Sequence, residues 1–184
     1  LGLVGQGQPG RLRGVDGLLG LRQTLADGTH LTVVDRRGQL LGHTVAAFGG
    51  RCHVALGLTT PLGFLDISFY RDDFARVGLN PQVKKSTIPL DIEDASIILV
   101  DDVLYTGRTI RAGMDALLDF GRPECVELLV LVDRRYSRQL PIEPDYIGIS
   151  VDTITAEKVK VRWKETDGED GIWLIGNETI ETKK

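Results

Sequence analysis

Two adjacent aspartates followed by a short polar turn are the residues of this chain best suited to do chemistry. Asp101 and Asp102 end an aliphatic run that begins at Ile97, and a Thr-Gly-Arg-Thr turn at residues 106–109 opens a helical pattern. Paired carboxylates can accept hydrogen bonds from neighbouring hydroxyls of a sugar. Backbone N–H groups at a helix start can hold a phosphate, especially with hydroxyls and an arginine nearby. Because open α/β folds place such groups at the carboxyl end of a strand, the pattern predicts a sugar-phosphate site.

Three other interpretations of these motifs are weaker. Strand-end aspartates commonly cap the next helix, and this role alone would give the acidic pair no chemistry. An aliphatic strand ending in two aspartates also resembles the acidic motif of ATPases, but the chain lacks the GxxxxGK[ST] loop that such enzymes need. Gly5, Gly7 and Gly10 match the dinucleotide fingerprint GxGxxG, although no strand–helix–strand unit surrounds them. Neither an ATPase nor a dinucleotide-binding protein is therefore favoured.

The segments around the acidic pair predict a strand–helix–strand unit of a parallel sheet. Residues 96–103 are continuously aliphatic before the aspartates, which is typical of a central strand covered on both faces. Residues 107–120 carry a helical apolar stripe that Gly121 and Pro123 end, and residues 125–132 form the next strand. Residues 64–70 alternate like a half-buried strand, and the polar residues 71–91 predict a long loop. Two shorter strands, at residues 158–163 and 171–176, close the chain.

Bulk properties limit the class of protein. The 184 residues, 42% hydrophobic and 26% charged, suit one soluble globular domain. No apolar run has the length of a membrane span, and two cysteines without metal or disulfide spacing suggest a reducing cytoplasm. A net charge of -4 argues against a general nucleic-acid-coating protein and leaves room for one local basic face.

Composition changes near Gly63. Most of the 22 glycines and all three histidines precede this point, whereas every lysine and every glutamate follows it. We therefore expect an atypical glycine-rich N-terminal segment at residues 1–63 and a core with C-terminal hood strands at residues 64–184. A divergent segment and a fragment or out-of-frame join are both open interpretations of the first part.

The stretch Ile97 to Thr109, IILVDDVLYTGRT, resembles the PRPP-binding motif of the type I phosphoribosyltransferases. Together with LDISFYRDDF at residues 65–74, RAGMDALLDFGRP at 111–123 and LVDRRYSRQLPIEPDYIG at 131–148, it resembles the bifunctional pyrimidine operon attenuator/uracil phosphoribosyltransferase family over roughly residues 61–175. The resemblance implies a type I phosphoribosyltransferase fold, which is an α/β fold with a mainly parallel twisted sheet, flanking helices and a small hood. It also implies a homodimer.

The same resemblance implies two activities. One is transfer of phosphoribose from PRPP to uracil, giving UMP and pyrophosphate, with Mg²⁺ carried by PRPP and no metal ligated directly by the protein. The other is pyrimidine-operon attenuation by binding an mRNA hairpin when UMP or UTP is present. A nucleotide-sensing RNA-binding regulator without useful catalysis, a damaged homologue that retains only the nucleotide site, and a purine or orotate transferase are the alternatives.

The family's functional residues carry over to matching positions of this chain. Asp101 and Asp102 would bind the ribose hydroxyls, residues 106–109 the 5-phosphate, and Arg71, at the start of a mobile lid, the pyrophosphate; these three charged side chains are the expected catalytic residues. Asp133 and Arg134 would border the uracil pocket, and Asp133 could instead be a strand-end cap. The expected substrate-binding residues are Ile97, Ile98, Leu99, Val100, Asp101, Asp102, Val103, Leu104, Tyr105, Thr106, Gly107, Arg108, Thr109, Asp133 and Arg134.

Two parts of the family pattern differ in this chain. The family's pyrophosphate loop has a Thr-Arg-Gly core, and the nearest match is Val33 to Gly38, VVDRRG; without such a loop, catalysis would be weak or absent. The family's Arg-Gly-His-Arg-Glu-Leu-Pro segment reads Arg-Arg-Tyr-Ser-Arg-Gln-Leu-Pro here, one residue longer. Arg135, Arg138 and Lys158 are the expected RNA-binding residues, with ordinary surface charge as the alternative.

Overall fold

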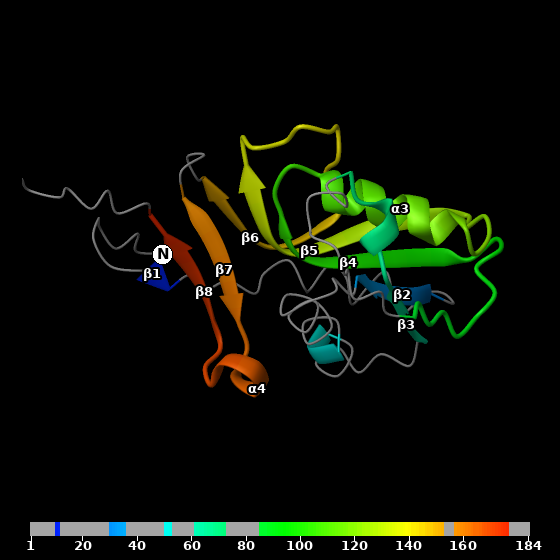
Figure 1. Cartoon of the computed structure of the whole chain (residues 1–184), viewed down its shortest axis with the longest axis horizontal. Helices are drawn as coiled ribbons and strands as arrows, with labels where there is room; N and C mark the ends of the chain where they lie inside the picture. The colour runs from blue at the N-terminus through cyan, green and yellow to red at the C-terminus, as the bar shows by residue number, and fades with distance from the viewer. Residues whose placement is uncertain are drawn as a thin grey trace, which may run out of the picture.

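Two β-sheets form the framework of the computed structural model (Figure 1). The structure describes residues 10–11, 30–35, 50–52, 61–72, 85–152 and 157–176. Within these residues, the larger sheet has the order β3-β2-β4-β5-β6 and is parallel throughout, and the smaller has the antiparallel order β1-β8-β7. The strands are β1 (Gly10–Arg11), β2 (His30–Asp35), β3 (Leu62–Leu65), β4 (Ser96–Leu104), β5 (Cys125–Arg135), β6 (Tyr146–Asp152), β7 (Lys158–Arg162) and β8 (Gly171–Ile175). The helices labelled among the described residues are the 3₁₀-helix η1 (Ser68–Tyr70) and the α-helices α3 (Arg108–Leu118) and α4 (Lys164–Asp167), and residues 50–52 are also helical.

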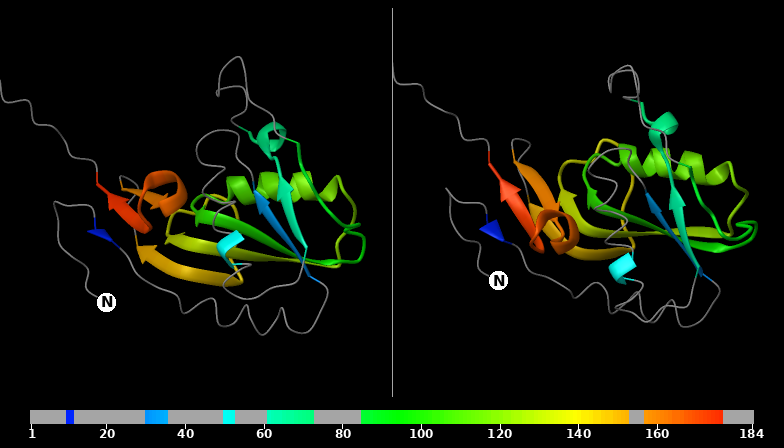
Figure 2. Two further views of the ribbon diagram at one scale, coloured as in Figure 1. Left: turned by 90° about the horizontal axis from the view of Figure 1, so that it is seen from below. Right: turned by 60° about the horizontal axis from the view of Figure 1, so that its bottom comes forward.

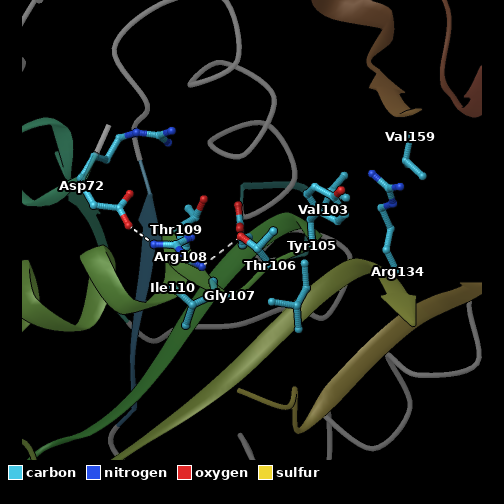
Figure 3. A pocket seen from close by; sticks show the side chains of 13 residues that line it. Asp72, Val103, Tyr105, Thr106, Gly107, Arg108, Thr109, Ile110, Arg134 and Val159 are labelled. Carbon is cyan, nitrogen blue, oxygen red and sulfur yellow. Dashed lines mark hydrogen bonds and ion pairs between the residues drawn. The ribbon is translucent and has the colours of Figure 1, made fainter. Parts of the chain in front are cut away.

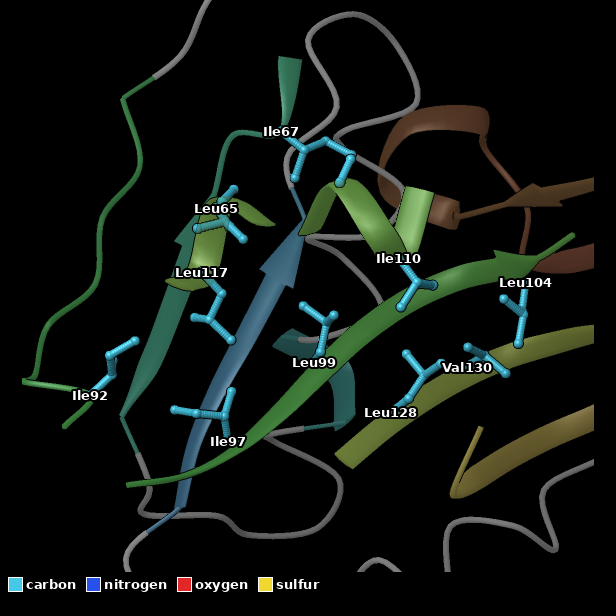
Figure 4. Packing of buried hydrophobic residues seen from close by; sticks show 12 residues of the cluster. Leu65, Ile67, Ile92, Ile97, Leu99, Leu104, Ile110, Leu117, Leu128 and Val130 are labelled. Carbon is cyan, nitrogen blue, oxygen red and sulfur yellow. The ribbon is translucent and has the colours of Figure 1, made fainter. Parts of the chain in front are cut away.

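Strand β4 occupies the middle of the parallel sheet, as its continuous aliphatic sequence predicted. It pairs with β2 on one side, where Val34 lies opposite Val100, and with β5 on the other, where Leu129 lies opposite Val100. Its two faces enter different hydrophobic clusters. Ile97 and Leu99 pack with α3, as Figure 4 shows, whereas Ile98 and Val100 pack in the cluster that also contains Trp163 and Ile172 from the hood. The α/β fold predicted from the sequence is confirmed.

Helix α3 covers one face of the sheet between β4 and β5 (Figure 2). Its buried side, Ile110, Ala112, Gly113, Ala116 and Leu117, follows the helical spacing that the sequence showed. Full burial of one such leucine, Leu117, stabilises the fold by roughly 2 kcal/mol. Leu118 lies outside this face, because its side chain is 51% exposed at the end of the helix.

The predicted strand over residues 64–70 was also wrong in its second half. Strand β3 ends at Leu65, and Ser68–Tyr70 form η1. Asp66 makes the difference, because its Oδ1 accepts the backbone N–H of Ser68 at 2.8 Å and so closes a turn of the Asx type. Leu65 and Ile67 are fully buried on either side of this turn, so the apolar alternation reflects burial rather than a continuous strand.

The remaining strands correspond to the sequence with small shifts. β5 runs three residues past the predicted Val132, because β6 pairs with it as far as Arg135, which lies opposite Asp152. β7 and β8 form the expected closing pair, and β1 joins them at the edge of β8. The boundary placed after Gly63 falls inside β3, and the division of the chain there stays a prediction. Among the described residues, no helix has the length and apolar character needed to cross a membrane.

Candidate functional site

A cavity of about 790 Å³ opens where β4 and β5 end and α3 begins (Figure 3). It lies at the carboxyl edge of the parallel sheet, where the sequence predicted a sugar-phosphate site. Val159 of the hood strand β7 closes one end, and the segment after η1 lies at the other (Figure 3). The lining residues are Arg71, Asp72, Asp101, Val103, Leu104, Tyr105, Thr106, Gly107, Arg108, Thr109, Ile110, Arg134 and Val159.

The turn from Thr106 to Thr109 forms the floor of the phosphate-binding candidate. Gly107 is the N-cap residue of α3 with φ +87°, a left-handed conformation that favours glycine. A Cβ atom at this position would lie 3.2 Å from Ile142 Cδ1, so the turn also packs tightly against the following loop. The Thr106 carbonyl oxygen accepts the N–H groups of Gln139 and Leu140 at 3.0 and 3.1 Å. The start of α3 therefore faces the cavity in a fixed orientation, and its dipole favours an anion there.

The acidic pair is buried at the end of β4. Asp101 is 1% exposed and lines the cavity, whereas Asp102 is 5% exposed and is not among the lining residues. Each carboxylate accepts the backbone N–H of the following residue, at 3.0 Å for Asp101 and 2.8 Å for Asp102. Of the two aspartates, Asp101 is therefore the one placed to meet a ligand in the cavity.

The aliphatic residues before the pair have a supporting position. Ile97, Ile98, Leu99 and Val100 are all at most 2% exposed, and none lines the cavity. Their side chains are packed in the two hydrophobic clusters, where they hold β4 in place and offer no surface to a ligand. These four residues were expected to bind substrate. In the structure they lie away from the cavity and support Asp101, the residue of β4 that follows them.

Arg134 and Tyr105 close the hood end of the cavity. Arg134 is the second-to-last residue of β5 and is nearly buried. Its guanidinium carbon lies 4.1 Å from the centre of the Tyr105 ring. Its Nη2 donates a hydrogen bond of 2.7 Å to the carbonyl oxygen of Glu157, just before β7. One arginine thus joins the loop after β4, the end of β5 and the hood.

Asp133 and Arg138 pair with one another away from the cavity lining. Asp133 is 6% exposed and forms an ion pair with Nη2 of Arg138. Arg138 also donates to the carbonyl oxygens of Tyr105 at 2.6 Å and Ile142 at 3.0 Å. Asp133 was expected to contact substrate and Arg138 to contact RNA. In the structure both side chains make these internal contacts, and their roles toward substrate and RNA stay predictions.

The other two RNA-binding candidates, Arg135 and Lys158, are exposed. Arg135 makes a double contact with Asp152, at 2.7 Å from Nε and 3.0 Å from Nη2. Beside it lies Tyr136, which is 85% exposed, has φ +64° and has its ring 5.9 Å from the Arg135 guanidinium carbon. Sequence reasoning missed Tyr136, although an aromatic residue between arginines is a recognisable signal.

At the far end of the cavity, Arg71 lies where the sequence placed it, and Asp72 forms an ion pair with Nη1 of Arg108. In the sequence, Asp72 belongs to the stretch LDISFYRDDF and was given no role of its own. The residues after β2 that match a pyrophosphate loop, 36–38, lie outside the described residues, although β2 itself ends at Asp35 beside β4. The part of the chain that the structure describes contains no group of three or more side chains suited to hold a metal ion.

Comparisons with known proteins agree with this arrangement. The phosphoribosyl transferase domain family matches residues 46–166. The bifunctional protein PyrR of Thermus thermophilus is 47% identical over 148 residues, covering 80% of this chain and 80% of that protein. PyrR of Desulfosudis oleivorans is 51% identical over 132 residues, covering 72% of this chain and 69% of that protein.

Solved structures with the same fold include hypoxanthine phosphoribosyltransferases. That of Trypanosoma cruzi has a TM-score of 0.59 at 15% identity, covering 87% of this chain and 83% of that chain. That of Staphylococcus aureus has a TM-score of 0.56 at 20% identity, with 88% and 84% covered. At this identity the likeness concerns the fold alone.

Proposed function

The chain belongs to the phosphoribosyltransferase family, within the group of bifunctional PyrR proteins, and we propose from this membership and from the cavity that it converts uracil and PRPP to UMP and pyrophosphate and also regulates pyrimidine genes through RNA. Membership makes the chain a transferase. The observation that carries the proposal is the placement of Asp101 and the 106–109 turn in one cavity at the carboxyl edge of the sheet.

The cavity supplies what a phosphoribosyl transfer needs at the sugar and the 5-phosphate. The Asp101 carboxylate can accept hydrogen bonds from ribose hydroxyls, and the start of α3, with Thr106, Thr109 and Arg108, can hold the 5-phosphate. Positive charge grows on the ribose ring as pyrophosphate leaves, and a buried carboxylate below the ring stabilises that charge. Arg71, which lines the same cavity, is the proposed donor to the leaving pyrophosphate.

The uracil ring is proposed to lie at the hood end of the cavity, beside Arg134 and Val159 (Figure 3). Tyr105 and the aliphatic Val159 offer apolar surface there, and the Arg134 side chain is held in place from two sides. Burying the base between these groups excludes water from the reacting carbon. Asp133 is proposed to have a positioning role, because it fixes Arg138, which in turn donates to the backbone carbonyl oxygen of Arg134 at 3.2 Å.

Mg²⁺ is proposed to enter the site with PRPP. Two carboxylates line the cavity. Asp101 is buried, and Asp72 is ion-paired with Arg108, so this pair fits a metal that arrives with the substrate better than one that the protein holds by itself. When bound, the metal would offset the negative charge of the pyrophosphate. Arg71 is the residue of this chain proposed to face that end of the substrate, while Asp101 faces the ribose hydroxyls.

The RNA surface is proposed to include Arg135, Tyr136 and Lys158. Arg135 and Lys158 supply charge toward phosphates, and Tyr136 offers an exposed ring on which an unpaired base can stack. The left-handed backbone of Tyr136 costs free energy, which is a feature that recurs at binding sites. We further propose that the chain acts in the cytoplasm as a homodimer; sedimentation equilibrium on the purified chain tests the dimer.

Catalysis is tested by incubating the purified chain with PRPP, Mg²⁺ and labelled uracil and measuring UMP and pyrophosphate. We expect turnover in the wild type and in Asp115→Asn, which removes an exposed carboxylate on α3. Asp101→Asn should lower kcat/KM by two or more orders of magnitude while the circular dichroism spectrum stays unchanged. Turnover that survives in Asp101→Asn would contradict the site assignment. Turnover absent from the wild type, with Asp101-dependent UMP binding retained, would leave a regulator without catalysis.

RNA binding is tested with a pool of hairpin RNAs with a randomised loop, selected on the wild-type chain in the presence of UMP. Tyr136→Ala should weaken binding of the selected hairpin about five- to fifty-fold, as loss of one stacked base does. Tyr136→Phe, which keeps the ring, should bind as the wild type does. Equal weakening by both substitutions would contradict base stacking at this position.

A further inference from the structure

Arg108 and Asp72 form an ion pair at the mouth of the cavity (Figure 3). Arg108 is the first residue of α3, and Asp72 follows η1, 36 residues earlier in the chain. The two side chains are 49% and 40% exposed, so both can be reached by a ligand from solvent. Nε of Arg108 also donates a hydrogen bond of 2.8 Å to Oε1 of Gln139. Gln139 therefore orients this guanidinium through Nε, while Asp72 covers the terminal nitrogen Nη1.

The position of Arg108 suits a phosphate as well as it suits Asp72. A guanidinium offers a planar set of donors that matches the oxygens of a phosphate or a carboxylate. The helix start at Arg108 adds backbone N–H groups and the positive end of the α3 dipole at the same place. An anion bound at the 106–109 turn and the carboxylate of Asp72 would thus seek the same side chain.

Anchoring of the chain before Asp72 limits what must change when an anion binds. Two residues before Asp72, the carbonyl oxygen of Tyr70 accepts a 2.9 Å hydrogen bond from Nη2 of Arg111 on α3. The backbone that leads to Asp72 is therefore attached to the same helix that carries Arg108. Exchange of partners at Arg108 needs a rotation of the Asp72 side chain and no separation of η1 from α3.

We propose that Asp72 competes with phosphate for Arg108 and thereby weakens anion binding at the 106–109 turn, so that free phosphate, which has no other contact, fills the site less than phosphate joined to ribose. This inference rests on the proposed function, in which the 106–109 turn holds the 5-phosphate of PRPP. Inorganic phosphate gains only the contacts of the turn and must displace Asp72. A ribose phosphate has the same cost but also gains hydrogen bonds from its hydroxyls to Asp101. Asp72 on this account sets the affinity of the phosphate site and does not itself contact the reacting atoms.

The size of the effect follows from the exposure of the pair. Exposed ion pairs stabilise by a few tenths to one kilocalorie per mole, which corresponds to a change of about two- to five-fold in an equilibrium constant. Asp72→Asn should therefore tighten binding of inorganic phosphate by about two- to five-fold. The gain should depend on Arg108, because the competition is for its guanidinium.

Isothermal titration calorimetry of the full chain with inorganic phosphate and with ribose 5-phosphate tests the proposal. Asp115→Asn is the matched control, since Asp115 is a similarly exposed carboxylate, 47% exposed, that pairs with Arg111 on the same helix. We expect tighter phosphate binding in Asp72→Asn and none of this gain in Asp115→Asn. In an Arg108→Ala background, Asp72→Asn should change phosphate affinity less than it does in the wild type. Asp72→Asn should tighten ribose 5-phosphate by the same factor as inorganic phosphate, so the ratio of the two dissociation constants should stay unchanged, because both ligands must displace Asp72.

Three results would overturn the proposal. These are unchanged phosphate affinity in Asp72→Asn, an equal gain in Asp115→Asn, and an equal gain with and without Arg108. Unfolding by urea checks that each variant is folded. Failure of the proposed function is seen separately. In that case Asp101→Asn would leave the affinity for ribose 5-phosphate unchanged.

Discussion

The guanidinium of Arg134 stacks on the ring of Tyr105, with its central carbon 4.1 Å from the ring centre, and so connects the end of β5 to the loop that follows β4. The two residues are 29 positions apart in the chain and meet only because β4 and β5 are neighbours with matched register, Leu104 lying opposite Asp133. A third segment joins them, since Arg134 also donates to the Glu157 carbonyl at 2.7 Å. This contact lies at the hood end of the cavity, so its loss should be felt by the base.

Arg134→Leu should raise KM for uracil while changing KM for PRPP much less. A desolvated cation–π contact and a hydrogen bond to the hood together stabilise by about 1–2 kcal/mol, which corresponds to roughly a five- to thirty-fold rise. Initial-rate kinetics with each substrate varied in turn measure the two constants. Arg135→Leu, which changes the neighbouring and more exposed arginine, is the control and should leave both constants unchanged. Equal effects on the two substrates would argue against a base-end role.

Gly107→Ala should raise KM for PRPP and destabilise the chain, whereas Gly168→Ala should only destabilise it. Both glycines have left-handed backbones, with φ +87° and +79°, so an alanine costs each about 1 kcal/mol. At Gly107 the added methyl also meets Ile142 at 3.2 Å, while at Gly168 nothing lies within 4 Å. Urea unfolding gives the two stabilities, and PRPP saturation curves separate the site from the surface turn. A normal KM in Gly107→Ala would mean that the turn does not hold PRPP.

Arg138→Met should destabilise the fold by about 3–5 kcal/mol, because it leaves the buried carboxylate of Asp133 without its partner. Replacing both residues, as Asp133→Leu with Arg138→Met, should recover part of that loss. Chemical denaturation of the two variants and of the single Asp133→Leu variant completes the cycle. A mild effect of Arg138→Met on stability, with a large loss of RNA binding, would restore the RNA role that the sequence suggested.

Cys52 should resist alkylation in the folded chain while Cys125 reacts. Burial raises the pKa of the Cys52 thiol to about 12, so almost none of it is thiolate at pH 8, and the side chain is 5% exposed. Cys125 is exposed at the start of β5. Alkylation with iodoacetamide followed by mass spectrometry should therefore find one modified thiol in buffer. It should find two in about 6 M urea, which unfolds the chain. Rapid native labelling of Cys52 would contradict its burial.

Tyr70 should contribute stability that disappears at alkaline pH. Its hydroxyl donates a hydrogen bond to the carboxylate of Asp119, and this bond, together with burial and the charges of Asp119 and Asp115, raises the pKa of Tyr70 above its usual value. Because the folded pKa is the higher one, the contribution is complete below the unfolded pKa of about 10 and is lost as pH rises through the folded pKa. The free energies of unfolding of the wild type and of Tyr70→Phe should differ by a constant amount from about pH 7 to about pH 9. The two values should converge as the pH rises above about 10. A difference independent of pH would contradict the hydrogen bond.

Local pattern in the sequence determined the strand–helix–strand unit and the position of the site. The aliphatic run to Val100, the turn at Gly107 and the stripe on α3 are short-range features, and their period and turn chemistry are legible without a partner. The same locality placed Asp101 at the carboxyl edge of the sheet, where the cavity lies. The acidic pair was less well resolved, because only the folded strand distinguishes Asp101, which lines the cavity, from Asp102.

Contacts between distant segments were decided by the tertiary structure alone. Asp66 ended β3 early by binding the N–H of Ser68, against an apolar alternation that predicted a longer strand. Arg135 and Arg138 are the same residue type three positions apart, yet Arg135 lies at the surface beside Asp152, whereas Arg138 is held by Asp133 and four backbone carbonyls. A charged side chain carries no local sign of which partner it will meet, because electrostatic and hydrogen-bonding partners are set by distance in space and not by separation along the chain.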